Sequence, residues 1–203
     1  MDMKFECDEN GIAYTYVNGT KGTLNVWDTQ ALIREISKCT GGEGDNIYVE
    51  TGSYLGCSSV LAGLVSSSNT MCYAHDVWDF DSLKGDSVMP PKVLEGDYFK
   101  MFYDNIRQNK LQNKVIPIRG DSKYTIGAIH KDKSIDIAFV DGDHSFDGIY
   151  GDLVALLPKM KPGGVILCHD CTKGSDTRRG LERFTSDFED IPGTHGMVKI
   201  VVE

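Results

Sequence analysis

The sequence lacks any run of about 18 apolar residues, the length that a membrane-spanning helix needs. Residues 1–11 alternate charged and apolar side chains, so the basic start and apolar stretch of a secretory signal are both missing. Positive charge is scarce too, with 21 lysines and arginines against 30 acidic residues and a formal net charge of -9. The electrostatic field of a protein with this negative net charge repels phosphate backbones and anionic lipid headgroups. We therefore expect a soluble, cytoplasmic protein that binds neither nucleic acid nor membranes, although Arg178 and Arg179 leave room for a local basic patch.

Cysteine is too sparse for a disulfide scaffold, because six cysteines are scattered over 203 residues. Cys168 and Cys171 have the C-x-x-C spacing that occurs in redox motifs and in half of a zinc site. No second C-x-x-C is present, and Cys168 closes an apolar run instead of opening a helix. We interpret most of the cysteines as reduced, packed side chains.

The chain from residue 46 onward alternates short apolar or β-branched runs with longer amphipathic segments, a pattern typical of strands and helices in a parallel sheet. The predicted strands are 46–50, 71–76, 114–118, 135–141 and 164–169. The runs 135–140 and 165–168 are almost continuously apolar, as central strands covered on both faces are. The sequence predicts one α/β domain over residues 1–203, with a Rossmann-like, doubly wound, mostly parallel sheet and helices on both faces.

The sequence also predicts structure outside these strands, in the N-terminal extension, in one long loop and near the C-terminus. We expect a small N-terminal β-hairpin over 1–27, with turns at Asn10-Gly11 and Asn18-Gly19, and a Rossmann-like core over 28–203. Asp28 is suited to cap the first helix. Residues 79–96 predict a long loop near the site, and 197–202 an edge strand.

The clearest ligand-binding pattern is the segment 47–58, which reads IYVETGSYLGCS and leads from a strand through two glycines into a helix over 59–65. Glycine lets the backbone turn sharply and approach a ligand, and the helix amino terminus offers unpaired N–H groups. A dinucleotide-binding loop would read G-x-G-x-x-G, but Tyr54 stands where the second glycine belongs. An NAD-dependent oxidoreductase is therefore the weaker alternative.

The letters E-x-G-x-x-x-G-x-S in this segment resemble motif I of class I S-adenosylmethionine-dependent methyltransferases, closest to the small-molecule O-methyltransferase branch. In that family the loop runs past the methionine part of the cofactor. The resemblance implies a cofactor-binding role for Glu50, Thr51, Gly52, Ser53, Gly56 and Ser58.

Two later strand ends fit the same resemblance. Asp76 ends a strand at the position where the family's second strand supplies a carboxylate for the ribose hydroxyls, an interaction strengthened by charge. A cap of the following loop is the alternative role for Asp76. Gly120, Asp121 and Ser122 match a turn that lies against the adenine in the family, and they equally fit a plain turn with a helix N-cap.

The run Asp141-Gly142-Asp143-His144-Ser145 ends an apolar strand with two acids and a histidine. Together with Asp152-Leu153, Lys161-Pro162-Gly163-Gly164 and His169-Asp170, it is similar to the D-G-D-H-S…D-L…K-P-G-G…H-D pattern of one methyltransferase subgroup. The resemblance covers residues 50–170 in the right order. Solvated loop charges are the alternative interpretation.

Asp141 and Asp170 should end neighbouring strands, so their carboxylates repel each other unless a cation or a proton joins them. Magnesium, a hard ion with oxygen ligands, resolves that conflict. The resemblance to catechol-type O-methyltransferases implies Asp141 and Asp170 as its ligands, but Cys171 stands where those enzymes have an amide, and sulfur is a poor ligand for magnesium. Either Asp143, His144 or His169 completes the ligand set, or the site holds no metal.

The catalytic candidates are Asp141, His144 and His169. Without a metal, His144 is the leading general base and His169 the reserve, because an imidazole exchanges protons near neutral pH; His169 equally fits a strand end satisfied by the backbone. We expect S-adenosylmethionine-dependent O-methylation of a small hydroxylated acceptor. The alternative is a relative that binds this cofactor or another nucleotide without catalysis. The sequence is compatible with a homo-oligomer, and it contains no motif that identifies the acceptor.

Overall fold

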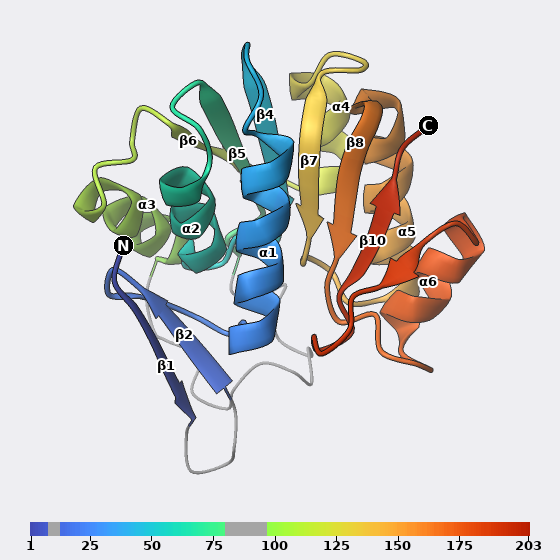
Figure 1. Cartoon of the computed structure of the whole chain (residues 1–203), viewed down its shortest axis with the longest axis horizontal. Helices are drawn as coiled ribbons and strands as arrows, with labels where there is room; N and C mark the ends of the chain where they lie inside the picture. Colours follow the sequence, from blue (N-terminus) through green and yellow to red (C-terminus); the bar gives the residue numbers. More distant parts are fainter. Residues whose placement is uncertain (8–12, 80–96) are drawn as a thin grey trace.

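Two strands with few polar residues, β7 (Ile135–Val140) and β8 (Met160–Cys168), lie side by side in a seven-stranded sheet. The computed structural model describes residues 1–7, 13–79 and 97–203. The strand order is β6-β5-β4-β7-β8-β10-β9, and the remaining strands are β4 (Asn46–Thr51), β5 (Thr70–Asp76), β6 (Val115–Arg119), β9 (Glu189–Asp190) and β10 (Val198–Val201). The pairs from β6 to β8 are parallel, and β10 runs antiparallel to both of its neighbours. The predicted mostly parallel sheet is confirmed (Figure 1).

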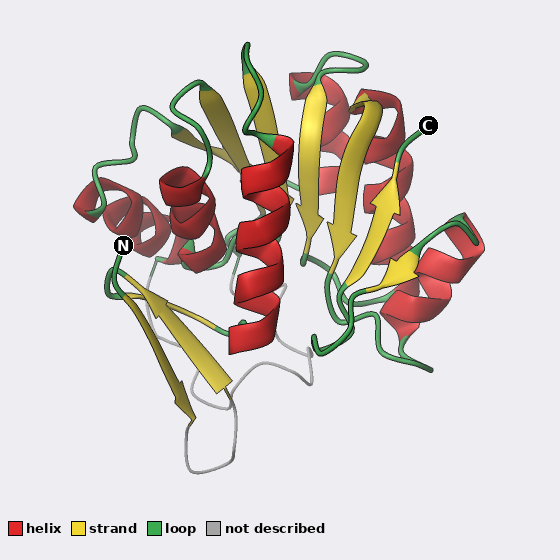
Figure 2. Cartoon of the chain, viewed as in Figure 1, coloured by secondary structure: helices red, strands yellow, loops and turns green. Residues whose placement is uncertain are grey.

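Helices cover both faces of this sheet, as expected for a doubly wound fold (Figure 2). The helical elements are α1 (Val26–Cys39), α2 (Cys57–Val65), α3 (Tyr98–Gln108), α4 (Ser122–Ile129), α5 (Phe146–Leu156), the short 3₁₀ helix η2 (Leu157–Lys159) and α6 (Asp176–Phe184). The first three helices pack with one buried cluster of apolar side chains, and α4, α5 and α6 pack with a second.

Strand β7 shows why the sequence is almost continuously apolar here. Ile137 and Phe139 belong to the cluster under α1, α2 and α3, whereas Ala138 and Val140 belong to the cluster under α4, α5 and α6. Successive side chains of a strand point to opposite faces, so a strand covered on both sides needs apolar residues toward both faces. Asp136, near the start of β7, is the exception and pairs with Lys161. The packing of this central layer fixes the positions of the ends of the strands, and the candidate site lies at those ends.

Helix α1 begins differently from the sequence prediction. Its N-cap is Asn25, whose side-chain oxygen accepts hydrogen bonds from the backbone N–H groups of Trp27 (2.8 Å) and Asp28 (3.0 Å). Asp28 itself lies inside the first turn and is completely buried. The prediction of Asp28 as the cap was therefore wrong, because its carboxylate is used for a tertiary contact.

The N-terminal extension is a three-stranded antiparallel sheet, larger than the predicted hairpin. Its strands are β1 (Met3–Cys7), β2 (Ala13–Val17) and β3 (Thr20–Gly22), in that order across the sheet. The predicted turn at Asn18-Gly19 joins β2 to β3, and both residues have positive φ, as such a turn requires. The other predicted turn, Asn10-Gly11, and residues 80–96 of the predicted loop lie outside the described residues.

The C-terminal strand β10 is not at the sheet edge, contrary to the sequence prediction. It lies between β8 and β9, and Val198 pairs with both Cys168 and Asp190. The edge is formed by β9, whose two acidic residues are exposed. A strand of two polar residues lacks the alternation of apolar and polar side chains that predicts a strand, so β9 could not be predicted from the sequence.

The structure also shows the surroundings of the two arginines and the cysteines singled out in the sequence. Arg178 pairs with Asp190 and Glu182, and Arg179 pairs with Asp176, so both guanidinium groups are matched by acids. All six cysteines are free, and Cys168 and Cys171 are buried. Among the described residues, no helix combines the length and apolar character that crossing a membrane requires.

Candidate active site

The predicted site residues meet at one edge of the sheet, where β4, β5, β7 and β8 end. These strands are parallel and adjacent, so their carboxyl ends share an edge, the usual ligand-binding edge of open α/β sheets. Backbone hydrogen bonds tie the ends together, from Gly52 N to His75 O (3.0 Å) and from Asp141 N to Thr51 O (3.0 Å). The loops after three different strands are thereby fixed relative to one another.

The loop between β4 and α2 depends on glycine at two positions. Gly52 has a φ of +79°, and a Cβ built there would lie 2.0 Å from the backbone oxygen of Asp141. Gly56 has a φ of +86° and forms the N-cap of α2 without a side-chain cap, while a Cβ there would meet the ring of Phe102 at 2.8 Å. The first loop therefore runs directly against the chain that carries Asp141, and the amino end of α2 keeps N–H groups for a ligand.

Glu50 lies beneath this loop and is completely buried. Its two carboxylate oxygens accept hydrogen bonds from the hydroxyls of Ser59 (2.6 Å) and Tyr48 (2.7 Å). Burial raises the pKa of Glu50, and these hydroxyl groups partly oppose that effect. In this geometry Glu50 supports the loop from inside, and a direct contact of Glu50 with a cofactor stays a prediction. Thr51, Ser53 and Ser58 are buried in the same loop region.

Asp76 connects the loops that follow β4 and β5. One carboxylate oxygen accepts a hydrogen bond from Tyr54 N (2.8 Å) and the other from Trp78 N (2.7 Å). Burial raises the pKa of Asp76, and these backbone N–H groups lower it. The backbone N–H groups of Ser53 and Val77 act on the same carboxylate. Asp76 therefore caps its loop, as the sequence also allowed, and a contact with a ribose stays a prediction.

The turn at Gly120, Asp121 and Ser122 lies beside β5. Gly120 N donates to Asp76 O (2.9 Å), which places the turn next to the predicted ribose-binding carboxylate. Asp121 is the N-cap of α4, as the sequence also allowed. The Ser122 hydroxyl donates to Asp152 at 2.5 Å, so it faces α5.

A cluster of acids and a histidine lies where β7 and β8 end. Ligand atoms of Asp141, His144 and Asp170 all lie within 4.8 Å of one another, which is close enough to hold one metal ion. The Nε2 atom of His144 is 3.7 Å from Asp141 Oδ1 and 3.5 Å from Asp170 Oδ2. Asp170 has a φ of 56°, an unfavourable backbone conformation for a residue with a side chain, of the kind found at functional sites.

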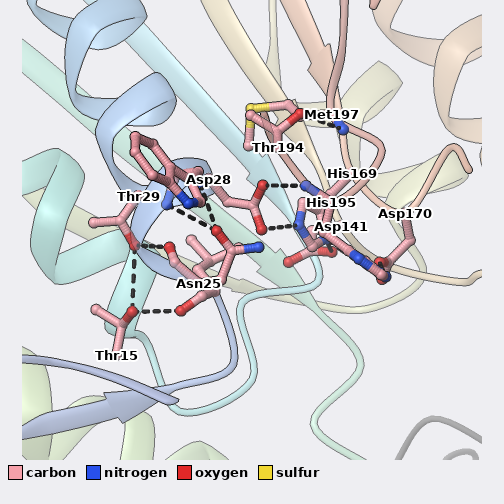
Figure 3. A network of polar contacts seen from close by, with 12 residues as sticks. Thr15, Asn25, Asp28, Thr29, Asp141, His169, Asp170, Thr194, His195 and Met197 are labelled. Atoms are coloured by element: carbon pink, nitrogen blue, oxygen red, sulfur yellow. Dashed lines mark hydrogen bonds and ion pairs between the residues drawn. The ribbon is translucent and has the colours of Figure 1, made fainter. Parts of the chain in front are cut away.

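His169 is buried behind this cluster and lies between two residues that are far apart in the sequence, Asp141 after β7 and Asp28 in α1. Its Nδ1 atom lies 3.1 Å from Asp141 Oδ1, and its Nε2 atom lies 3.1 Å from Asp28 Oδ2 in α1 (Figure 3). The other oxygen of Asp28 accepts a hydrogen bond from His195 N (2.8 Å). Asp28 thus belongs to this network, although the sequence pattern predicts it as a helix cap.

The histidines and carboxylates of this network stabilise each other's charged forms. Burial alone raises the pKa of Asp141, but His169 and His144 outweigh it and lower this pKa to about 2. Burial likewise lowers the pKa of His169, while the carboxylates of Asp141, Asp170 and Asp28 raise it well above its ordinary value. The structure therefore favours a charged imidazole held between carboxylates, with Asp141 ionised.

Cys171, which stands in place of the amide, and the candidate ligand Asp143 lie outside the three-residue cluster. The Cys171 thiol is buried and donates to His169 O at 3.5 Å, so its sulfur is directed to the backbone. Asp143 Oδ1 accepts a hydrogen bond from Ser145 N (2.9 Å) at the start of α5. His144 forms the three-residue cluster with Asp141 and Asp170 in the described part of the chain. The Nδ1 atom of buried His169 also lies close to both carboxylates, 3.1 Å from Asp141 Oδ1 and 3.4 Å from Asp170 Oδ2.

Solved structures share this fold. The O-methyltransferase NovP aligns with a TM-score of 0.70 and 16% identity, over 89% of this chain and 81% of that one. The O-methyltransferase TomG from Streptomyces achromogenes, solved with S-adenosylmethionine, aligns with a TM-score of 0.62 and 15% identity over 89% and 83% of the two chains. An O-methyltransferase from Bacillus cereus in complex with SAH aligns with a TM-score of 0.62 and 16% identity over 89% and 82%.

The sequence comparisons agree with this likeness. The uncharacterized protein y4gI of Sinorhizobium fredii is 28% identical over an alignment of 131 residues. The alignment covers 60% of this chain, and the chain spans only 13% of the length of that curated relative. A family model described as a methyltransferase domain matches residues 49–171, from the strand before the glycine loop through Cys171. Since this match covers more than half of the chain, the protein belongs to that methyltransferase domain family.

Proposed function

We propose that the protein is an S-adenosylmethionine-dependent O-methyltransferase that acts on a small hydroxylated acceptor. One observation carries this proposal: the glycine loop, Asp76 and the Asp141–His144–Asp170 cluster lie at neighbouring strand ends within the matched region 49–171. A cofactor held by the first two features would extend along the edge of the sheet toward the third.

The residues fit an adenosyl cofactor with a methionine tail. The amino end of α2 has no side-chain cap, so its N–H groups are suited to the carboxylate of the tail. Asp76 ends β5 beside the glycine loop and is suited to the ribose hydroxyls. The turn at 120–122, where Gly120 N donates to Asp76 O, is suited to lie against the adenine. When bound, S-adenosylmethionine supplies a methyl group on a positively charged sulfur, already activated for transfer.

The acid–histidine cluster supplies the groups for the acceptor. A hydroxyl placed between cofactor and cluster could pass its proton to Nε2 of His144, which lies between Asp141 and Asp170. The two carboxylates would stabilise the imidazolium that results. His169 is buried behind Asp141 and serves to orient that carboxylate, so we assign it a positioning role.

A metal-assisted route uses the same three residues. Asp141, Asp170 and His144 form a donor set of two carboxylates and one imidazole, which suits manganese or zinc as well as magnesium. A divalent ion held there would supply Lewis acidity that orients the acceptor hydroxyl and lowers its pKa. In that route His144 is a ligand and does not take the proton.

Calorimetric titration tests the cofactor class. S-adenosylmethionine and S-adenosylhomocysteine should bind, and NAD should not. Asp76→Ala should weaken binding by about tenfold to a hundredfold, the effect of losing charge-assisted hydrogen bonds. Asp45→Ala is the matched control, because Asp45 is an exposed carboxylate at the opposite, amino end of β4. Binding of NAD, or equal affinities for both variants, would contradict the proposal.

A further inference from the structure

Strand β1 (Met3–Cys7) forms an open edge of the N-terminal sheet. The strand order is β1-β2-β3, and within the described residues β1 pairs only with β2. Figure 1 shows β1 at the periphery, with β2 between it and α1. An open edge strand presents unpaired backbone groups that can pair with another strand.

The hydrogen-bond pattern shows which groups face outward. Asn18 N donates to Asp2 O (2.8 Å), so residues 2 and 18 form a hydrogen-bonded pair of the β1–β2 ladder. Such pairs alternate along antiparallel strands, and therefore Lys4 and Glu6 also direct their backbone groups toward β2. The N–H and C=O groups of Met3, Phe5 and Cys7 point to the open edge.

The side chains of β1 are unusually apolar for an open edge. Met3 is 36% exposed and Phe5 is 40% exposed, and both are among the exposed large hydrophobic residues. The charges beside them are of opposite sign, because Lys4 and Glu6 form an ion pair along the strand. Natural edge strands are usually protected by charged side chains, proline or bulges. The two charges of β1 neutralise each other, and its described residues include no proline, so this edge is suited to a partner of matching charge order.

The order of residues in β1 is complementary to itself. If two copies pair in antiparallel fashion with the two Phe5 residues opposite each other, Lys4 lies opposite Glu6 of the second copy, and Met3 lies opposite Cys7 of the second copy. Pairing centred on Lys4 or on Glu6 would place like charges opposite each other, as would a parallel arrangement in register. Opposite charges stabilise a directly facing cross-strand pair, and like charges destabilise it.

We propose that two copies of this chain associate through β1, in antiparallel pairing centred on Phe5, and that the two N-terminal sheets thereby join into one. The contact forms a closed two-fold arrangement, because the same strand is used by both copies. It lies on the extension and uses none of the residues assigned to the cofactor or the acceptor, so the proposal is independent of the proposed function.

Sedimentation velocity of the full chain over a range of concentrations tests this proposal with charge swaps. The wild type should show a concentration-dependent dimer. Lys4→Glu and Glu6→Lys should each raise the dimer dissociation constant by about tenfold, since two facing pairs change from attraction to repulsion. The double variant Lys4→Glu/Glu6→Lys restores opposite charges and should return the constant to near the wild-type value. Lys131→Glu, an exposed charge change outside the extension, should have no effect.

Three results would overturn the proposal: a wild-type monomer at every concentration, single variants that dimerise as the wild type does, or a double variant no better than the singles. Circular dichroism checks that all variants fold. A cross-link gives a second readout, because Phe5→Cys in a Cys7→Ser background should form an intermolecular disulfide upon oxidation. Cys7→Ser alone should not, and equal cross-linking of the two would count against the Phe5-centred register.

Discussion

The carboxylate of Asp28 lies 3.1 Å from Nε2 of His169, although the two residues are 141 positions apart in the sequence. Asp28 belongs to the first turn of α1, and His169 follows β8. Because the other ring nitrogen of His169 faces Asp141, this contact links the helix that precedes the sheet to the acid–histidine cluster (Figure 3).

Asp28→Ala should lower the free energy of unfolding by about 3–5 kcal/mol, because it leaves a buried imidazole and the backbone N–H of His195 without their partner. Denaturant unfolding measures the change. Asp147→Ala is the control, since Asp147 is also an acid in the first turn of a helix but is exposed. It should cost less than about 1 kcal/mol. Equal losses would show that Asp28 contributes only through the helix dipole.

Gly52→Ala should abolish cofactor binding and strongly destabilise the fold, because the added Cβ would lie 2.0 Å from the Asp141 backbone. Gly163→Ala separates this clash from simple strain: Gly163 has the same φ of +79°, but its Cβ would meet nothing within 4 Å. The control should lose about 1–2 kcal/mol and bind the cofactor normally. Thermal melts and titrations check both variants, and similar behaviour of the two would refute the close approach.

Asp152 should make the protein less stable as the pH rises. Burial raises the pKa of Asp152 to about 6, whereas the same group in the unfolded chain has a pKa near 3.8. The folded state therefore holds a proton that the unfolded state has lost, and the stabilising contribution disappears as the pH rises from about 4 to above 6. Asp152→Asn should be more stable than the wild type at pH 7 and should lose that advantage near pH 4. Unfolding at several pH values measures this difference, and a constant difference would contradict it.

The pair His75 and His130 should have the opposite effect. Their Nε2 atoms lie 3.0 Å apart, and burial lowers the pKa of His75 to about 3 and that of His130 to about 4. Each folded value is below the unfolded one, so stability present above pH 6.5 is lost as the pH falls toward 4. His130→Gln should reduce this acid sensitivity. The check is the difference in unfolding free energy between wild type and variant from pH 7 to pH 4, and parallel curves would contradict the prediction.

Manganese titration tests the acid–histidine cluster as a metal site. Asp170→Asn should weaken binding at least about tenfold, because it removes one of two anionic ligands. Asp143→Asn is the control, since Asp143 caps the adjacent turn and lies outside the cluster. Equal affinities for wild type and both variants would favour the route in which His144 takes the proton.

Local patterns in the sequence predicted the sheet and the strand ends at which the candidate site residues gather. The apolar run of β7 and the glycines after β4 each follow from a few neighbouring residues, and the match over 49–171 agrees with the family resemblance. The contact of Asp28 with His169 could not be read in this way, because it joins distant segments. The placement of β10 beside a two-residue strand depends on tertiary pairing for the same reason.

A crystal structure with S-adenosylhomocysteine gives the most direct test of the proposed cofactor site. The ribose hydroxyls should donate to Asp76, the amino acid tail should lie at the amino end of α2, and the sulfur should face Asp141 and His144. A ligand bound at another edge of the sheet, or a ribose that does not contact Asp76, would contradict the proposal.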